Sequence, residues 1–395
     1  MLDATLRDRA RGLLTPSGRS NVPPFMVMDV MAAAARIEAA GGRVIHMEAG
    51  QPAASAPKTA ISAARAAIEG GRIDYTSALG IASLRQRIAR HYHESYRCAV
   101  DADRIVVTTG SSGGFILAIL ALFEPGDRVA VTVPGYPPYR HILTALDCEP
   151  VLIETSSETR HALTGEALLA AHREKPLQGV LVGSPANPTG TMMSREALAG
   201  LMTAAESAGI RFISDEIYHG LDYAFPAVTA AELSPHALVI NSFSKYFCMT
   251  GWRIGWMVVP EPLVRPIERL QQNLLISVPT LSQIAAEAAF EGAAEMEAIK
   301  RGYQENRRVL IEGLPRAGLT DFLPADGAFY LYADISKFTS NSFAFASEML
   351  EKAHVAATPG IDFDPVHGQA FIRLSYARSA DEMRQAVARI TAWLT

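Results

Sequence analysis

The sequence contains few cysteines and no long hydrophobic run. Its 395 residues include three cysteines, Cys98, Cys148 and Cys248, which are too few and too scattered for a disulfide framework or a paired-cysteine metal site. No metal site is therefore expected, and reduced thiols are typical of a cytoplasmic protein. The longest apolar run, residues 115–123, is far shorter than the roughly 20 residues that span a bilayer, so no membrane association is expected.

An excess of positive charge is also missing. The formal net charge is −5, so no basic field is available to neutralise a phosphate backbone, and nucleic acid is not an expected partner. The amino terminus, MLDATLRDRARGLL, mixes acidic residues with arginines and lacks the continuous apolar core of a signal peptide, which predicts a cytoplasmic location. With 49% hydrophobic and 19% charged residues, the composition is that of a globular protein with more than one domain.

Short β-branched runs alternate with longer helical patterns in the middle of the chain. These runs begin at Arg104, Arg128, Pro150, Gly179, Ile210, Leu238 and Ile254. Near-continuous apolar strands separated by helices predict a mostly parallel, roughly seven-stranded sheet that lies between helices. The predicted fold class is therefore α/β.

The flanking segments have other patterns. Residues 1–45 predict an extended arm and then a helix over 27–40. Residues 263–314 predict a long helical region that is broken at Pro279 and Gly302. Two strands and two helices follow, as in a smaller α+β domain. The predicted domains are an arm and helix at 1–45 that join the small domain, a large domain at 46–285 and a small C-terminal domain at 286–395.

One predicted strand leads into the sequence SFSKYFCMTGWRIG, residues 242–255, which contains Lys245 and Arg253. Most lysines are solvated surface residues, and that interpretation remains open here. The flanking Phe243, Tyr246 and Trp252 favour another, because desolvation by apolar surface lowers a lysine pKa and frees its lone pair. Such a lysine can attack carbonyls, as in Schiff-base formation with pyridoxal phosphate. Arg253 either clamps phosphate oxygens or forms a surface ion pair.

Three further polar clusters follow predicted strands, where open parallel sheets bind their ligands. The first, TTGSSGG at residues 108–114, precedes a helix and suits an anion, although it lacks the spacing of nucleotide-binding loops. The second, SPANPTG around Asn187, is equally consistent with an ordinary turn. In the third, SDEIY, Asp215 is either a helix N-cap or the partner of a cationic ring nitrogen, with Tyr218 facing a phenolic oxygen of the same ligand.

The order TTGSSGG, SPANPTG, SDEIY, SFSK and GWRIGW resembles the class I and II aminotransferases, which are aspartate aminotransferase-like enzymes of fold type I. The resemblance extends from Gly50 in EAGQP to Arg373 in FIRLSYA. It implies pyridoxal 5′-phosphate as the cofactor and a ping-pong exchange of an amino group between an L-amino acid and a 2-oxo acid, with 2-oxoglutarate as the expected acceptor. It also implies a homodimer whose sites are shared across the interface.

The resemblance assigns roles to individual residues. Lys245 matches the Schiff-base lysine, Asp215 the partner of the pyridine nitrogen, and Tyr218 a catalytic contact to the ring hydroxyl oxygen. The expected substrate contacts are Gly50, Asn187, which also faces the ring oxygen, and Arg373, which holds the α-carboxylate. The other expected cofactor contacts are the ring-stacking Tyr136, the phosphate-binding Ser111, Ser112, Ser242, Ser244 and Arg253, and Tyr75, which reaches the phosphate of the neighbouring subunit.

Two other functions use the same features. A C–S β-lyase shares the lysine, the aspartate and the phosphate site. A non-enzymatic cofactor-sensing regulator would need a DNA-binding module, and no helix-turn-helix pattern precedes Gly50.

The sequence departs from one pattern of the family. Some bacterial aspartate aminotransferases carry a lysine at the position of Ser112, where it favours substrates with acidic side chains. Ser112 has no charge, and Arg19 in the amino-terminal arm either replaces that lysine or is an ordinary solvated arginine. We therefore expect that aspartate is not strongly preferred and that neutral or aromatic amino acids compete well.

Overall fold

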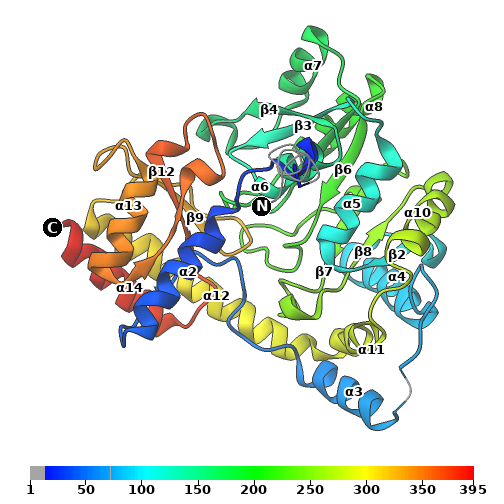
Figure 1. The fold of residues 1–395 in the computed structure, drawn as a ribbon, viewed down its shortest axis with the longest axis horizontal. Coiled ribbons are helices and arrows are strands. Elements are labelled where there is room, and N and C mark those ends of the chain that lie inside the picture. The colour runs from blue at the N-terminus through cyan, green and yellow to red at the C-terminus, as the bar shows by residue number, and fades with distance from the viewer. Residues whose placement is uncertain (1–13, 72) are drawn as a thin grey trace, which may run out of the picture.

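The computed structural model describes residues 14–71 and 73–395, and a twisted seven-stranded sheet forms its centre (Figure 1). The strand order is β2-β8-β7-β6-β5-β3-β4; β7, β6, β5, β3 and β4 run parallel, and β8 is antiparallel to both of its neighbours. The predicted α/β class and mostly parallel sheet are confirmed. The strands are β2 (Ile105–Thr108), β3 (Arg128–Val133), β4 (Glu149–Glu154), β5 (Gly179–Gly183), β6 (Arg211–Asp215), β7 (Leu238–Ser242) and β8 (Gly255–Val258).

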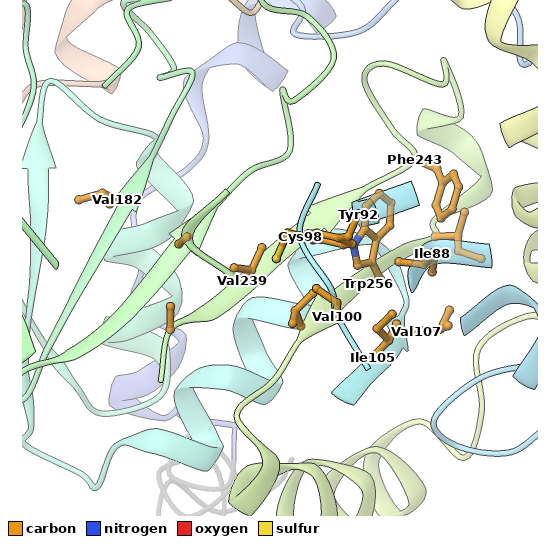
Figure 2. Close-up of a cluster of buried hydrophobic side chains, with 14 of the residues drawn as sticks. Ile88, Tyr92, Cys98, Val100, Ile105, Val107, Val182, Val239, Phe243 and Trp256 are labelled. Carbon is orange, nitrogen blue, oxygen red and sulfur yellow. The ribbon is translucent and has the colours of Figure 1, made fainter. Parts of the chain in front are cut away.

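Alternate residues of these strands enter two different hydrophobic clusters, because successive side chains of a strand point to opposite faces. Figure 2 shows one cluster, in which Val107, Val239 and Trp256 lie on the same side as Ile88 and Tyr92. The helices on this face include α4 (Ala82–Tyr96), α7 (Gly165–Glu174), α8 (Arg195–Ser207) and α11 (Thr280–Ala289), and α3 (Lys58–Glu69) packs against α11. The opposite face is covered by α5 (Gly110–Leu122), α6 (Pro137–Ala145) and α10 (Glu261–Leu274).

The carboxyl-terminal part of the chain has its own sheet and its own hydrophobic cluster. An antiparallel sheet of order β11-β12-β9 packs with α12 and α14, while α2 and α13 lie beside it (Figure 1). The domain boundaries at residues 46 and 286 remain a prediction. The elements are α2 (Met26–Ala39), α12 (Ala293–Gly313), β9 (Tyr330–Asp334), α13 (Ser342–Glu348), β11 (Thr358–Pro359), β12 (Phe371–Ser375) and α14 (Ala380–Leu394).

The predicted break at Gly302 is wrong, whereas Pro279 does precede a new helix as the N-cap of α11. Helix α12 runs through Gly302 without interruption. A glycine inside a helix costs only about 1 kcal/mol. That cost is small against the burial of Met296, Tyr303 and Leu310 on one face of the helix.

A short strand pair that the sequence pattern did not predict joins the two ends of the chain. β1 (Ile45–His46) runs parallel to β10 (Val355–Ala356). Just beyond this pair, the Thr358 hydroxyl donates a 3.0 Å hydrogen bond to the carbonyl of Glu48, across 310 residues of sequence. The EAGQP segment is thereby fixed against the carboxyl-terminal sheet.

No helix among the described residues is long and apolar enough to cross a membrane. Within residues 14–71 and 73–395, no group of three or more His, Cys, Asp or Glu side chains is arranged to hold a metal ion. The amino-terminal sequence that carries the prediction of a cytoplasmic location lies, up to residue 13, outside the described residues.

Candidate active site

A cavity of about 250 Å³ lies beyond the carboxyl ends of β3, β5, β6 and β7, where open parallel sheets bind ligands. Most of the predicted site residues line it, and they come from both the central and the carboxyl-terminal sheet. Ser242 and Tyr75 do not line it. The predicted residues that do are Gly50, Ser111, Ser112, Tyr136, Asn187, Asp215, Tyr218, Ser244, Lys245, Arg253 and Arg373.

Lys245 follows β7 and points into this cavity, where its Nζ donates a 2.6 Å hydrogen bond to the carbonyl of Gly50. Burial, together with the charges of Arg373 and Arg253, lowers the pKa of Lys245 to about 8 against the opposing effect of Asp215. The aromatic residues next to Lys245 in the sequence, which suggested this desolvation, do not line the cavity. Phe243, for example, belongs to the hydrophobic cluster behind the sheet. The apolar surroundings of the amine come from other elements.

The low pKa predicts unusual reactivity for Lys245 in protein freed of any carbonyl ligand. Only the neutral amine is nucleophilic, so reaction rises with pH through about 8, whereas an ordinary lysine with a pKa of 10.5 reacts at higher pH. Brief reductive methylation at a series of pH values, read by peptide mass spectrometry, measures the midpoint. The exposed Lys352 serves as the reference site in the same spectra. A midpoint for Lys245 above pH 10 would contradict the prediction.

Asp215 is the last residue of β6 and is buried at the end of the cavity. Its Oδ1 accepts a 3.0 Å hydrogen bond from the backbone N–H of Ile217, and its Oδ2 accepts one from the hydroxyl of Tyr139. Burial raises the pKa of Asp215 to about 6, while these two hydrogen bonds and Lys245 oppose the rise. No helix begins at Asp215, so the N-cap interpretation is wrong.

Arg373 lies on β12 and is almost completely buried. Its Nη1 donates to Asn187 Oδ1 at 2.9 Å, and its Nη2 donates to the carbonyl of Glu48 and to Thr358 Oγ1. None of the ion pairs among the described residues includes Arg373, and its buried Nε has no hydrogen-bond partner there. The guanidinium is therefore held in place with its charge available to an anion in the cavity.

At another part of the cavity, helix α5 begins next to Arg253. Its N-cap Thr109 makes no side-chain capping bond, so the first N–H groups of the helix are available to an anion, which the helix dipole also favours. Gly110 has φ +67°, and an added Cβ would lie 2.6 Å from Nη2 of Arg253, so glycine is required for this approach. Ser242 lies behind the cavity wall, where its hydroxyl bonds with Ser244 Oγ at 2.9 Å and positions it.

Two tyrosines that the sequence analysis missed support the predicted ones. Tyr139 reaches Asp215 across 76 residues, and its ring makes an edge contact with Tyr136 at 5.2 Å between centroids. Tyr330, on β9, places its hydroxyl 2.7 Å from that of Tyr218. The position of Tyr139 one helical turn after Tyr136 was a weak signal in the sequence.

The amino-terminal helix α2 contributes an apolar wall that was not predicted. Val27, Met28 and Met31 of α2 line the cavity together with Phe25, the residue before the helix, and Ile217. Among the residues that the structure describes, the cavity lining carries three cations, those of Lys245, Arg253 and Arg373.

Arg19 and Tyr75, like Ser242, do not line this cavity. The side chain of Arg19 is 65% exposed and pairs with Asp147 at 3.1 Å. Within this chain it therefore does not replace the lysine that some aspartate aminotransferases carry at the position of Ser112. Tyr75 is 82% exposed. The segment that carries Tyr75 is tied to α11, because Thr280 donates to the carbonyl of Asp74 and Gln283 to the hydroxyl of Thr76.

Comparisons with known proteins identify the family. The model of aminotransferase class I and II matches residues 43–390. A valine–pyruvate aminotransferase of Mycobacterium tuberculosis is 48% identical over 380 residues, 95% of this chain and 97% of that protein. An aspartate aminotransferase of Thermotoga maritima is 30% identical, over 95% of this chain and 98% of its own length.

Solved structures agree with this assignment. The crystal structure of an aminotransferase from Mycobacterium tuberculosis is 47% identical with a TM-score of 0.94, over 96% of this chain and 99% of that one. The aspartate aminotransferase from Thermus thermophilus with maleate is 30% identical with a TM-score of 0.90, over the same fractions of the two chains. The chain therefore belongs to the class I and II aminotransferases, enzymes that transfer amino groups.

Proposed function

We propose that the enzyme uses pyridoxal 5′-phosphate and moves the amino group of an amino acid with an uncharged side chain to a 2-oxo acid by a ping-pong mechanism. The observation that carries this proposal is the placement of Lys245, with its lowered pKa, in one cavity with the buried carboxylate of Asp215 and the buried guanidinium of Arg373.

The residues around the cavity fit pyridoxal phosphate. The uncapped start of α5, Ser111, Ser244 and Arg253 suit its phosphate. Asp215 suits its ring nitrogen, because a buried carboxylate with a raised pKa gains from a cationic partner. Ser112 completes the phosphate side, where Ser242 acts from behind the wall by positioning Ser244. Asn187 and Tyr218 suit the ring hydroxyl oxygen, and Tyr136 suits the ring face.

When bound, the cofactor supplies a carbonyl for the amino group and a ring that accepts the electrons released at the substrate Cα. Lys245 provides the amine that holds the carbonyl and then carries a proton to or from Cα, which a pKa near neutrality favours. Arg373 binds the substrate α-carboxylate, and its bond to Asn187 fixes the orientation of the guanidinium. Asp215 keeps a proton on the ring nitrogen.

An uncharged side chain is the best match for the rest of the cavity. Phe25, Val27, Met28 and Met31 offer apolar contacts. Arg253 and Arg373 are committed to the phosphate and to the α-carboxylate, so among the described residues of this chain no further cation on the cavity wall is free for a second carboxylate. The relative from Mycobacterium tuberculosis, named for valine and pyruvate, supports this choice and makes pyruvate an acceptor to test beside 2-oxoglutarate.

The substrate proposal predicts that valine, alanine and phenylalanine each exceed aspartate in kcat/KM. A carboxylate without a cationic partner pays desolvation in this cavity, so a deficit of about tenfold, or roughly 1.4 kcal/mol, is expected for aspartate. The comparison uses fixed pyruvate or fixed 2-oxoglutarate.

Ser112→Lys should raise kcat/KM for aspartate alone, while the matched Ser112→Met, which adds length without charge, should not. A hundredfold advantage of aspartate in the wild-type enzyme would instead show that another cation serves its side chain. Release of ammonia and pyruvate without any amino acceptor would assign a β-lyase reaction to the same site.

A homodimer with shared sites is also part of the proposal. It rests on the exposed ring of Tyr75, whose segment is hydrogen-bonded to α11, and on the role of its counterpart in the family. Other exposed apolar side chains are Ile73, two residues before Tyr75, and Leu274, Leu275 and Ile276 at the end of α10, which a second copy of the chain would cover.

A further inference from the structure

Tyr330 is a buried residue with a hydroxyl at the edge of the active-site cavity. It begins β9, has no exposed surface and lines the cavity. Its hydroxyl lies 2.7 Å from the hydroxyl of Tyr218, and the two rings meet edge to face at 5.6 Å. The pair therefore forms a hydrogen bond in which either oxygen is able to donate.

The surroundings of Tyr330 decide which oxygen donates once a ligand is bound. The Tyr330 hydroxyl packs against Gly50, where an added Cβ would collide with it. Among the described residues, Tyr218 is its only hydrogen-bond partner. A buried hydroxyl that fails to donate loses a hydrogen bond, so Tyr330 donates to Tyr218 whenever Tyr218 has another acceptor. Tyr218 meets that condition when an oxygen of the ligand occupies the cavity.

The ring of Tyr330 is fixed by its neighbours, so its hydroxyl has little freedom to turn away. Tyr330 and Arg373 are diagonal neighbours on the same face of the β9–β12 pair. The Arg373 guanidinium carbon lies 4.5 Å from the centroid of the Tyr330 ring, and Phe329 makes an edge contact with the same ring at 4.9 Å.

We propose that Tyr330 is a positioning residue that orients the Tyr218 hydroxyl, so that Tyr218 donates a hydrogen bond to the ring oxygen of the cofactor. This inference rests on the proposed function, in which Tyr218 faces that oxygen. A donor that itself accepts a hydrogen bond is polarised and donates more strongly. Tyr330 thus acts through Tyr218 and stabilises negative charge on the cofactor oxygen.

Tyr330→Phe removes one oxygen and keeps the ring, which makes it the direct test. The visible absorbance of bound pyridoxal phosphate is titrated with pH. A weaker hydrogen bond from Tyr218 leaves the ring oxygen less able to bear negative charge. The midpoint of this absorbance titration is therefore expected to move to higher pH by about half a unit, which is the size of the effect of losing one hydrogen bond. Tyr218→Phe should move it further in the same direction.

Tyr332→Phe is the matched control. Tyr332 lies two residues along β9, stacks on Phe371, and has a buried hydroxyl without a partner among the described residues, yet it does not line the cavity. Its replacement should leave the midpoint unchanged. The double variant Tyr218→Phe/Tyr330→Phe should match Tyr218→Phe alone, because residues that act in series are not additive.

Three results would overturn the inference. They are an unchanged midpoint in Tyr330→Phe, an equal shift in Tyr332→Phe, and a further shift when Tyr330→Phe is added to Tyr218→Phe. If wild-type protein binds no pyridoxal phosphate, the proposed function fails with the inference. If it binds and Tyr218→Phe alone shifts the midpoint, only the role of Tyr330 fails.

Discussion

Replacing Lys245 with alanine is expected to lower the rate of transamination by about ten-thousandfold. The substitution removes both the amine that holds the cofactor carbonyl and the group that moves the proton at Cα, and a positioned acid–base group alone contributes up to about ten-thousandfold. The variant should still bind pyridoxal phosphate, because the start of α5, Ser244 and Arg253 are untouched. Single-turnover kinetics with valine and equilibrium dialysis of the cofactor measure the two effects.

Mixing Lys245→Ala chains with Tyr75→Ala chains tests whether the lost activity belongs to a site shared between two subunits. If sites are shared in a homodimer, a hybrid of one Lys245→Ala chain and one Tyr75→Ala chain contains one site with neither substitution. If Tyr75→Ala lowers activity, co-refolded mixtures should then be more active than the mean of the two separate variants. Near-normal turnover by Lys245→Ala would remove Lys245 from the mechanism, and a fully active monomer would remove Tyr75 from the site.

A loss of about a thousandfold in kcat is expected for Asp215→Ala. Opposite charges in contact interact by roughly 4 kcal/mol at an effective dielectric of about 20, which corresponds to about three orders of magnitude in rate. Without the carboxylate the ring nitrogen loses its proton and accepts electrons less well. Pre-steady-state absorbance changes after mixing with amino acid measure the chemical step separately from binding.

Asp215→Asn separates charge from shape, since asparagine keeps the hydrogen bond from the Ile217 N–H. We expect it to lose nearly as much rate as Asp215→Ala. Wild-type kcat in either variant would show that Asp215 serves packing and not catalysis.

Much of the central sheet could be predicted because its strands are short and apolar on both faces, as in β5 and β7. Regions where the local sequence pattern and the tertiary packing disagree could not be predicted. β1, β10 and β11 have two residues each, too few for any periodicity to show. Gly302 predicted a break in the helix, because a glycine in the sequence gives no information about the length and burial of the helix around it.

The same limit applies to the site. Lys245, Asp215 and Arg253 were found because they stand in continuous motifs at strand ends. Tyr330 was not found from the sequence, because its partner Tyr218 is 112 residues away. Only the packing of the two sheets brings the two tyrosines together. The apolar wall from α2 was missed for the same reason, since a helical pattern does not specify which cavity its apolar face will line.

The joining of β1 to β10 has a consequence for biosynthesis. The phosphate side of the cavity is complete in sequence by Arg253, but the clamp on the α-carboxylate needs Glu48 and Arg373, which are separated by 325 residues. During translation the amino-terminal part must therefore wait, unpaired, until nearly the whole chain has left the ribosome. Such late, long-range closure slows folding and leaves strand edges exposed to aggregation.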